Sequence, residues 1–466
     1  GNALSINTNS ANITASNVIS GAGSLTKLGT NTLTLSGNNT YSGVTNITVG
    51  TLSAQNANAL GSTASGTIVA SGATLEINNA NIGNEALTLS GTGAGGAGAL
   101  LGVGTSSLSG NITLAADTTM GGAGTLTLSG IIGESGGARA LTKEDAGTLI
   151  LAGANTYSGL TIINAGTLQA ANASALGATT AGVNVGTGAT LEINNVNIGA
   201  ENVALAGATL ASSGTAQING AISTTGTGNV INANAASTFS VAGNINGPGD
   251  LTTQGAGTIN ISGNIGNTLR LSSLTVGSNT NLSGSIFTTG NQTYNNAIVL
   301  TSNRTYDSSS GDIVFNSTID GAFDFIVSSI SNITFAGTVG ATALNSLTAT
   351  ANNINLNGGA ITTTGNQTYN GSLNLGADTT LSTSGSGSGT IAVNNGVTGN
   401  RQLTLAGAAS SNDTFILSGS IGVSNLVVNG GAGGNDTLSV NSGSTQNFAI
   451  NGSNAGQITE IGRAHV

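Results

Sequence analysis

The sequence predicts an all-β protein whose chain winds into a right-handed parallel β-helix, an elongated β-solenoid. Three observations lead to this fold class: short strands with a period of two, internal repeats at fixed spacing, and a composition rich in small neutral residues. Together they favour stacked coils over one globular core, because repeat proteins grow by adding units and not by enlarging a core.

The strand signal is an alternation of polar and apolar residues over four or five positions. Residues 32–36 (TLTLS) alternate and then stop at Gly37, and residues 73–77 (ATLEI) behave alike. Such alternation is typical of a half-buried strand. No long segment carries apolar residues at helical spacing, and Thr, Gly, Asn and Ser are poor or middling helix formers. The chain is therefore expected to be almost entirely β.

The repeats fix how these strands are arranged. Residues 25–27, 39–43 and 73–79 recur at 141–143, 155–159 and 189–195, each 116 positions later, and residues 288–295 recur at 363–370. Within a block, the Thr-Leu pair at 51–52 recurs at 74–75, a spacing of 23 residues that suits one coil of a parallel β-helix. With strands ~4.8 Å apart, about twenty coils would form a rod on the order of 100 Å long.

The composition fits stacked coils better than an ordinary globule. Charged residues make up only 5% of the 466 residues, with 75 Gly, 1 Pro and 0 Cys. We expect Leu, Ile and Val to fill the core, Asn and Thr to stack on the next coil, and Gly to occupy corners with positive φ. The low proline content agrees with strands that are hydrogen-bonded on both sides.

Charge and composition also exclude several classes of function. The formal net charge of −10 comes from 17 acidic and 7 basic residues that are scattered singly, which disfavours binding to nucleic acid or to anionic lipid. No run approaches the ~20 apolar residues of a membrane helix. The sequence starts at Gly1 without a signal peptide, so we interpret it as an internal fragment.

The repeated motifs resemble a known family. The pattern Leu-Thr-Lys at 25–27, Asn-Thr-Tyr-Ser-Gly at 39–43 and Gly-Thr-Leu at 50–52 is similar to the autotransporter-associated β-strand repeat of type V secretion passenger domains. The later repeats, 288–295 and 363–370, resemble those of filamentous-haemagglutinin-like adhesins. The resemblance implies a β-helical stalk on the outside of a bacterial cell and an outer-membrane translocator that lies outside this sequence.

From these repeats we expect three segments. Residues 1–270 would be a β-helix with autotransporter-type repeats, with duplicated blocks near 25–92 and 141–208. Residues 271–460 would continue the β-helix with haemagglutinin-like repeats, and residues 461–466 would be a non-native tail. The tail, Ile-Gly-Arg-Ala-His-Val, departs from the preceding composition, and ATC-GGA-AGA-GCA-CAC-GTC, which encodes it, matches a common sequencing adapter.

Catalytic constellations are few. Serine nucleophiles normally need a histidine base, and the only histidine is His465 in the expected tail. Polysaccharide-cleaving β-helices use carboxylate pairs, and the adjacent acidic pair here is Glu144 and Asp145. Glu76 and Glu192 lie mid-strand, where period two turns them outward. We expect no catalytic residues, and the basic residues form no cluster that would hold an anionic sugar: Lys27, Lys143, Arg139, Arg270, Arg304 and Arg401.

Two binding features were weighed against simpler interpretations. Residues 431–438 (GAGGNDTL) approach a calcium-binding β-roll nonapeptide, and Asp413 precedes Asp436 by 23 residues, which could stack them on successive coils. We interpret both as aspartates that lead turns and expect no metal and no cofactor. Four tyrosines could form a sugar-binding platform, although packing against the next coil is the simpler interpretation: Tyr41, Tyr157, Tyr294 and Tyr369.

The sequence thus predicts a non-enzymatic adhesin stalk, displayed outside the cell or on the outer-membrane surface. Its expected partners are a protein or glycan of a host or neighbouring cell, or another copy in a biofilm, and not nucleic acid. A β-helical polysaccharide-active enzyme is one alternative. An ice-binding solenoid is another, suggested by Thr-x-Thr steps such as residues 32–34.

Overall fold

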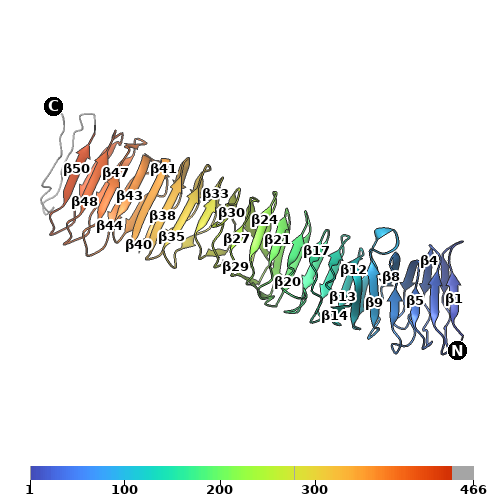
Figure 1. Cartoon of the computed structure of the whole chain (residues 1–466). Coiled ribbons are helices and arrows are strands. Elements are labelled where there is room, and N and C mark those ends of the chain that lie inside the picture. The colour runs from blue at the N-terminus through green and yellow to red at the C-terminus, as the bar shows by residue number, and fades with distance from the viewer. Residues whose placement is uncertain (1, 278, 443–466) are drawn as a thin grey trace. The chain divides into compact units, whose positions relative to one another are not determined.

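The computed structural model describes residues 2–277 and 279–442 and shows a parallel β-solenoid, as the sequence predicts. These residues form two compact units, which are divided between Gly243 and Asn244. Every strand pairing between described residues is parallel, and Figure 1 shows the strands of each unit side by side as successive rungs. The right-handed sense of the solenoid and the segment boundary at residue 270 stay predictions. The expected non-native tail at 461–466 lies outside the described residues.

The first unit consists of short strands and a single turn of 3-10 helix, η1 Ala94–Gly96. Its strands are β1 Leu4–Asn7, β2 Ile13–Ala15, β3 Leu25–Leu28, β4 Thr32–Leu35, β5 Thr45–Ile47, β6 Gly50–Ala54, β7 Thr67–Val69, β8 Ala73–Asn78, β9 Leu87–Gly91, β10 Leu100–Val103, β11 Thr105–Leu108, β12 Ile112–Gly121, β13 Thr125–Leu128, β14 Ile132–Glu134, β15 Leu141–Lys143, β16 Thr148–Leu151, β17 Thr161–Ile163, β18 Thr167–Ala170, β19 Val183–Val185, β20 Thr190–Asn194, β21 Val203–Ala206, β22 Thr209–Ser213, β23 Thr215–Ile218, β24 Ile222–Thr225, β25 Val230–Ala233 and β26 Thr238–Val241.

The second unit continues in the same manner. Its strands are β27 Ile245–Asn246, β28 Leu251–Gln254, β29 Thr258–Ile261, β30 Leu274–Val276, β31 Thr280–Leu282, β32 Ile286–Thr288, β33 Gln292–Tyr294, β34 Ile298–Val299, β35 Arg304–Ser308, β36 Ile313–Phe315, β37 Ile319–Asp320, β38 Asp324–Ser329, β39 Asn332–Phe335, β40 Val339–Leu344, β41 Ser346–Leu356, β42 Ala360–Thr363, β43 Gln367–Leu375, β44 Thr379–Thr383, β45 Thr390–Val393, β46 Val397–Thr398, β47 Gln402–Ala406, β48 Thr414–Ser418, β49 Asn425–Asn429 and β50 Thr437–Asn441. No helix among the described residues is long and apolar enough to cross a membrane.

The register of the strands confirms the predicted coil. Thr51 and Leu52 of β6 pair with Thr74 and Leu75 of β8, so the 23-residue spacing is one turn of the solenoid. In the same column, Leu33, Leu52, Leu75 and Leu100 follow one another on successive coils, and all four side chains are buried. The core is therefore a continuous apolar stripe, which each coil extends by one side chain per column.

Aromatic side chains fill the core of the second unit. Tyr294, Phe315 and Phe335 occupy one column, with ring centroids 4.9 Å and 5.3 Å apart and planes nearly parallel. Phe325 meets Tyr306 edge-on at 5.2 Å. Such ring pairs add specific contacts to the area that they bury.

Polar side chains connect the coils on the outer face, as predicted. Six threonines stand in register on successive strands β11, β13, β16, β18, β20 and β22: Thr105, Thr125, Thr148, Thr167, Thr190 and Thr209. In the second unit, amide side chains bond to each other across coils, at 2.8 Å from Asn316 to Asn295 and 2.7 Å from Asn394 to Asn370. These ladders replace the charged surface of an ordinary globule.

Candidate functional site

The two lysines of the first unit are buried inside it. Lys27 is 0% and Lys143 is 1% exposed. Lys27 lies on the same face of β3 as Leu25, and its Nζ donates to the carbonyl oxygens of Leu28, Gly29 and Val49 at 3.1, 2.7 and 2.9 Å. Burial lowers the pKa of both lysines. These ammonium groups therefore link the turns of neighbouring coils and offer no positive surface to a ligand.

Lys143 makes the equivalent contacts in the second block. Its Nζ donates to the carbonyl oxygens of Glu144, Asp145 and Ala165 at 2.6, 2.7 and 3.1 Å. The Glu144 carboxylate accepts from Asn164, and the Asp145 carboxylate accepts from the backbone N–H of Gly122. The acidic pair that we considered for catalysis thus belongs to a turn built around a buried lysine.

The tyrosines do not form a sugar-binding platform, and that alternative is wrong. Tyr41, Tyr157, Tyr294 and Tyr369 are all buried. Their hydroxyl groups find partners inside the solenoid, because a buried phenol needs a hydrogen bond. In the first unit the Tyr41 hydroxyl lies 2.6 Å from the Thr45 hydroxyl.

The repeated segments 288–295 and 363–370 encode one internal hydrogen-bond network each. The Tyr294 hydroxyl donates to Gln292 Oε1 at 2.7 Å, and Gln292 Nε2 donates to Thr288 Oγ1 at 3.0 Å. Tyr369 and Gln367 repeat the first contact at 2.9 Å. Because these partners lie inside the solenoid, the Tyr and Gln side chains of each motif stabilise a coil, while Asn295 and Asn370 at the motif ends lie on the outer face.

Two glutamates that the sequence analysis did not single out are buried in the first unit. Glu85 is 1% and Glu201 is 2% exposed, and they lie 116 residues apart at equivalent positions. Each precedes a strand by two residues, as Glu85 precedes Leu87 of β9. That spacing places Glu85 on the buried face of Leu87, which is the signal that could have identified it.

The carboxylates at the predicted outward positions do face outward. Glu76 lies between buried Leu75 and Ile77 and is partly exposed, and its carboxylate accepts from Ser53 Oγ at 2.7 Å. Glu192 accepts from Gln169 Nε2 at 2.9 Å. Each is held by polar neighbours on adjacent strands of its own face.

The aspartates at 413 and 436 lie on successive coils, since β48 pairs with β50 in the expected register. Both are buried. Asp413 Oδ1 accepts from the N–H of Gly389 at 2.7 Å, and its Oδ2 accepts from Ala408 N–H and Ser411 Oγ at 2.8 and 2.5 Å. Asp436 Oδ1 accepts from the N–H of Asp413 at 2.8 Å. Donors therefore occupy both carboxylate oxygens of Asp413, which a calcium ion would need, whereas Asp436 Oδ2 is buried without a hydrogen-bond partner among the described residues.

We expect the β-sheet signal in circular dichroism to be unchanged when calcium is chelated. The Asp413 carboxylate already accepts hydrogen bonds from backbone N–H groups, so its oxygens are not free to bind a metal ion. Among the described residues, no group of three or more His, Cys, Asp or Glu side chains could hold a metal. Thermal melts with EDTA, calcium and magnesium would check this. A melting temperature that rises with calcium and not with magnesium would contradict it.

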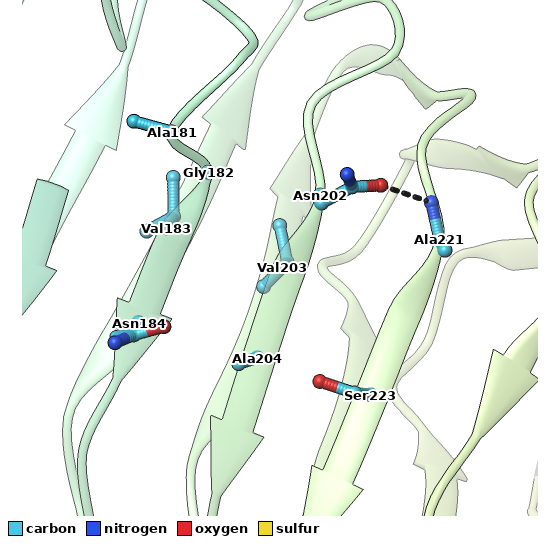
Figure 2. A pocket seen from close by; sticks show the side chains of 9 residues that line it. All are labelled: Ala181, Gly182, Val183, Asn184, Asn202, Val203, Ala204, Ala221 and Ser223. Atoms are coloured by element: carbon cyan, nitrogen blue, oxygen red, sulfur yellow. Dashed lines mark hydrogen bonds between the residues drawn. The ribbon is translucent and has the colours of Figure 1, made fainter. Parts of the chain in front are cut away.

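A shallow neutral groove lies on the outer face of β17, β19, β21 and β24. Two hollows of about 290 and 360 Å³ share Asn184 and Ala204. Figure 2 shows Ala204 between Asn184 and Ser223, with Asn202 bonded to the N–H of Ala221 at one end. Small side chains such as Ala204 form the floor, and larger residues flank it, among them Ile162 and Thr225.

The groove is uncharged. No acidic or basic residue lines either hollow. Amide and hydroxyl side chains are its polar groups, and they can donate and accept hydrogen bonds at neutral pH. The arrangement suits a neutral polar ligand, and it lacks the paired carboxylates of a glycosidase.

Comparisons with known proteins agree with the motifs. The passenger-associated-transport-repeat model matches residues 25–54 and 141–170. An autotransporter adhesin, BmaC of Brucella suis biovar 1 (strain 1330), is 51% identical over 72 residues, which is 16% of this chain and 2% of that protein. The chain thus covers a small part of the relative that it matches. No solved structure matches the chain.

Proposed function

We propose that this chain, which carries two passenger-associated transport repeats, is the β-helical stalk of an adhesin displayed outside a bacterial cell. One observation carries this proposal. The Lys, Tyr and Gln side chains of the repeated motifs form hydrogen bonds inside the solenoid, whereas the outer face carries few charged groups. The similarity to an autotransporter adhesin supports surface display.

The outer face suits adhesion or self-association over an extended surface. The in-register threonines of β11 to β22 and the asparagine pairs of the second unit offer hydrogen-bonding groups without strong charge. Neutral ladders repel a second copy weakly, whereas a surface rich in one sign of charge would repel it strongly. A cell-surface protein or glycan is therefore the proposed partner, with another copy of the chain as a further one.

The chain is proposed to be non-enzymatic. The carboxylates weighed for catalysis accept hydrogen bonds within turns or strand faces, as Glu144 does from Asn164. No acidic residue lines either hollow of the neutral groove. A polysaccharide-cleaving enzyme would need two carboxylates converging on one cleft.

Ice binding is less well supported. A flat array needs neighbouring columns of threonine, and the column beside Thr105–Thr209 is mixed. It contains Ser107, Thr127, Ile150, Gln169 and Glu192. A charged residue and a long amide there interrupt the regular surface.

Beads coated with the purified chain are expected to adhere to cells or to one another. We expect Ala204→Trp, which fills the neutral groove, to reduce adhesion several-fold if the groove contacts the partner. Ile68→Trp, at an exposed position of β7 outside the groove and the threonine column, is the control and should leave adhesion unchanged. Beads that bind neither cells nor each other would contradict the proposed function.

A further inference from the structure

The buried glutamates form two equivalent polar clusters inside the first unit. In the first cluster, Thr67 Oγ1 donates to Glu85 Oε1 at 2.7 Å, and Tyr41 and Thr45 lie on the preceding coil. Glu85 Oε2 is buried without a hydrogen-bond partner among the described residues. A carboxylate in this position would carry a buried charge with incomplete compensation.

The second cluster has one donor fewer. Tyr157 and Thr161 match Tyr41 and Thr45, with 2.7 Å between their hydroxyl oxygens. Val183 pairs with Thr161, as Thr67 pairs with Thr45, and so replaces the threonine that donates to Glu85. Glu201 Oε1 is buried and without a partner among the described residues. The two clusters therefore differ by one hydrogen bond, the one that Thr67 donates to Glu85 and that Val183 cannot donate to Glu201.

Within residues 2–277 and 279–442, no ion pair balances either carboxyl. The ion pair found among the described residues joins Arg270 to Asp307, in the second unit. The titratable side chains beside the two glutamates are the phenols of Tyr41 and Tyr157. Burial raises the pKa of Tyr41 to about 12 and also raises that of Tyr157, so both phenols stay neutral at physiological pH. The charge of Glu85 also contributes to the raised pKa of Tyr41, as that of Glu201 does for Tyr157.

We propose that Glu85 and Glu201 are pH-responsive elements of the solenoid. Each carboxyl is protonated in the folded chain under acid conditions, and its ionisation toward neutral pH loosens the coil that carries it. This inference goes beyond adhesion and does not depend on it. Glu201 directly precedes Asn202, which bounds the neutral groove. Ionisation of Glu201 therefore also loosens that groove.

The direction of the effect follows from linkage. Burial raises the pKa of Glu201 from 4.5 to about 7, and it raises that of Glu85 while the Thr67 hydrogen bond opposes the rise. Below the ordinary value both states hold the proton, so the buried carboxyl carries no charge penalty. As the pH rises from 4.5 to about 7, the unfolded chain is ionised while the folded chain resists ionisation, so the free energy of unfolding falls, and above about 7 both states are ionised and the fall ends.

The test follows the Glu δ-carbons by NMR in the ¹³C-labelled full chain. Glu201 is expected to titrate near 7, and Val183→Thr, which restores the missing donor, should lower its midpoint. Thr67→Val should raise the midpoint of Glu85. A δ-carbon of Glu201 that titrates near 4.5 would overturn the proposal.

Thermal melts provide an independent readout. The melting temperature should fall by roughly 5 °C between pH 5 and pH 8. Combining Glu85→Gln with Glu201→Gln should abolish that fall, whereas the control pair Glu76→Gln and Glu192→Gln, on the outer face, should retain it. Persistence of the full decrease in the first pair would show that other groups are responsible and would refute the proposal. If that pair fails to fold, the NMR midpoints of the native chain decide the question.

Discussion

Leu33→Asp is expected to unfold the first coils of the solenoid. Leu33 is 0% exposed and lies in the inward column between Ile13 and Leu52. Aspartate there would place an unpaired carboxylate in the apolar stripe, which should lower the free energy of unfolding by on the order of 5 kcal/mol. Denaturant melts of the full chain, with circular dichroism as the readout, would measure this loss.

Glu76→Ala is the matched control, because it changes a side chain that faces outward whereas Leu33→Asp changes one that faces inward. Its carboxylate is on the outer face of β8 and bonds to Ser53, so its removal should cost at most about 1 kcal/mol. Leu33→Ala separates lost packing from added charge, with an expected loss of about 2–5 kcal/mol. Equal destabilisation by Leu33→Asp and Glu76→Ala would show that the assigned faces are wrong.

Lys27→Ala is expected to lower the free energy of unfolding by about 3 kcal/mol or more. The substitution removes the donor for three backbone carbonyl oxygens, those of Leu28, Gly29 and Val49, and leaves a cavity where the lysine stem packed. Lys143→Ala should have a similar effect in the second block, because its ammonium makes three equivalent contacts. Denaturant melts of both variants would check this.

Two further variants identify what causes the loss of stability in Lys27→Ala. Lys27→Met keeps an apolar stem and removes the donor, so it should recover part of the stability lost in Lys27→Ala. Thr26→Ala, on the opposite face of β3, should change the free energy of unfolding by about 0.5 kcal/mol or less. A Lys27→Ala protein as stable as Thr26→Ala would contradict a structural role for the buried ammonium.

The period-two pattern made the faces of most strands predictable. It placed Leu33 inside and Glu76 outside, and the 23-residue spacing between Thr51 and Thr74 gave the register of neighbouring coils before any coordinates. Parallel in-register stacking follows from such repeats, because a one-residue slip would move every apolar side chain to the solvent. The asparagine and threonine ladders follow from the same register.

The alternation along β3 puts Lys27 on the same face as Leu25, but it does not show what a buried ammonium group would contact. Only the structure shows three carbonyl oxygens converging on the ammonium, two from its own turn and one from Val49 on the next coil. The tyrosines are a similar case, since Tyr41 is buried because Thr45 accepts or donates at its hydroxyl. Sequence periodicity assigns a face, but it does not identify the partners that make burial of a polar group tolerable.

The sequence by itself determined the fold class and the inward phase of the apolar residues, because these depend on a local period repeated along one chain. The tertiary structure decided which polar residues are internal, that Asp413 is held by N–H and O–H donors, and that a neutral groove lies above β21. The physical reason is that a polar side chain is stable inside only when groups from other coils satisfy it. Those groups are mostly backbone atoms of other turns, and the identity of a residue does not reveal where its backbone atoms lie.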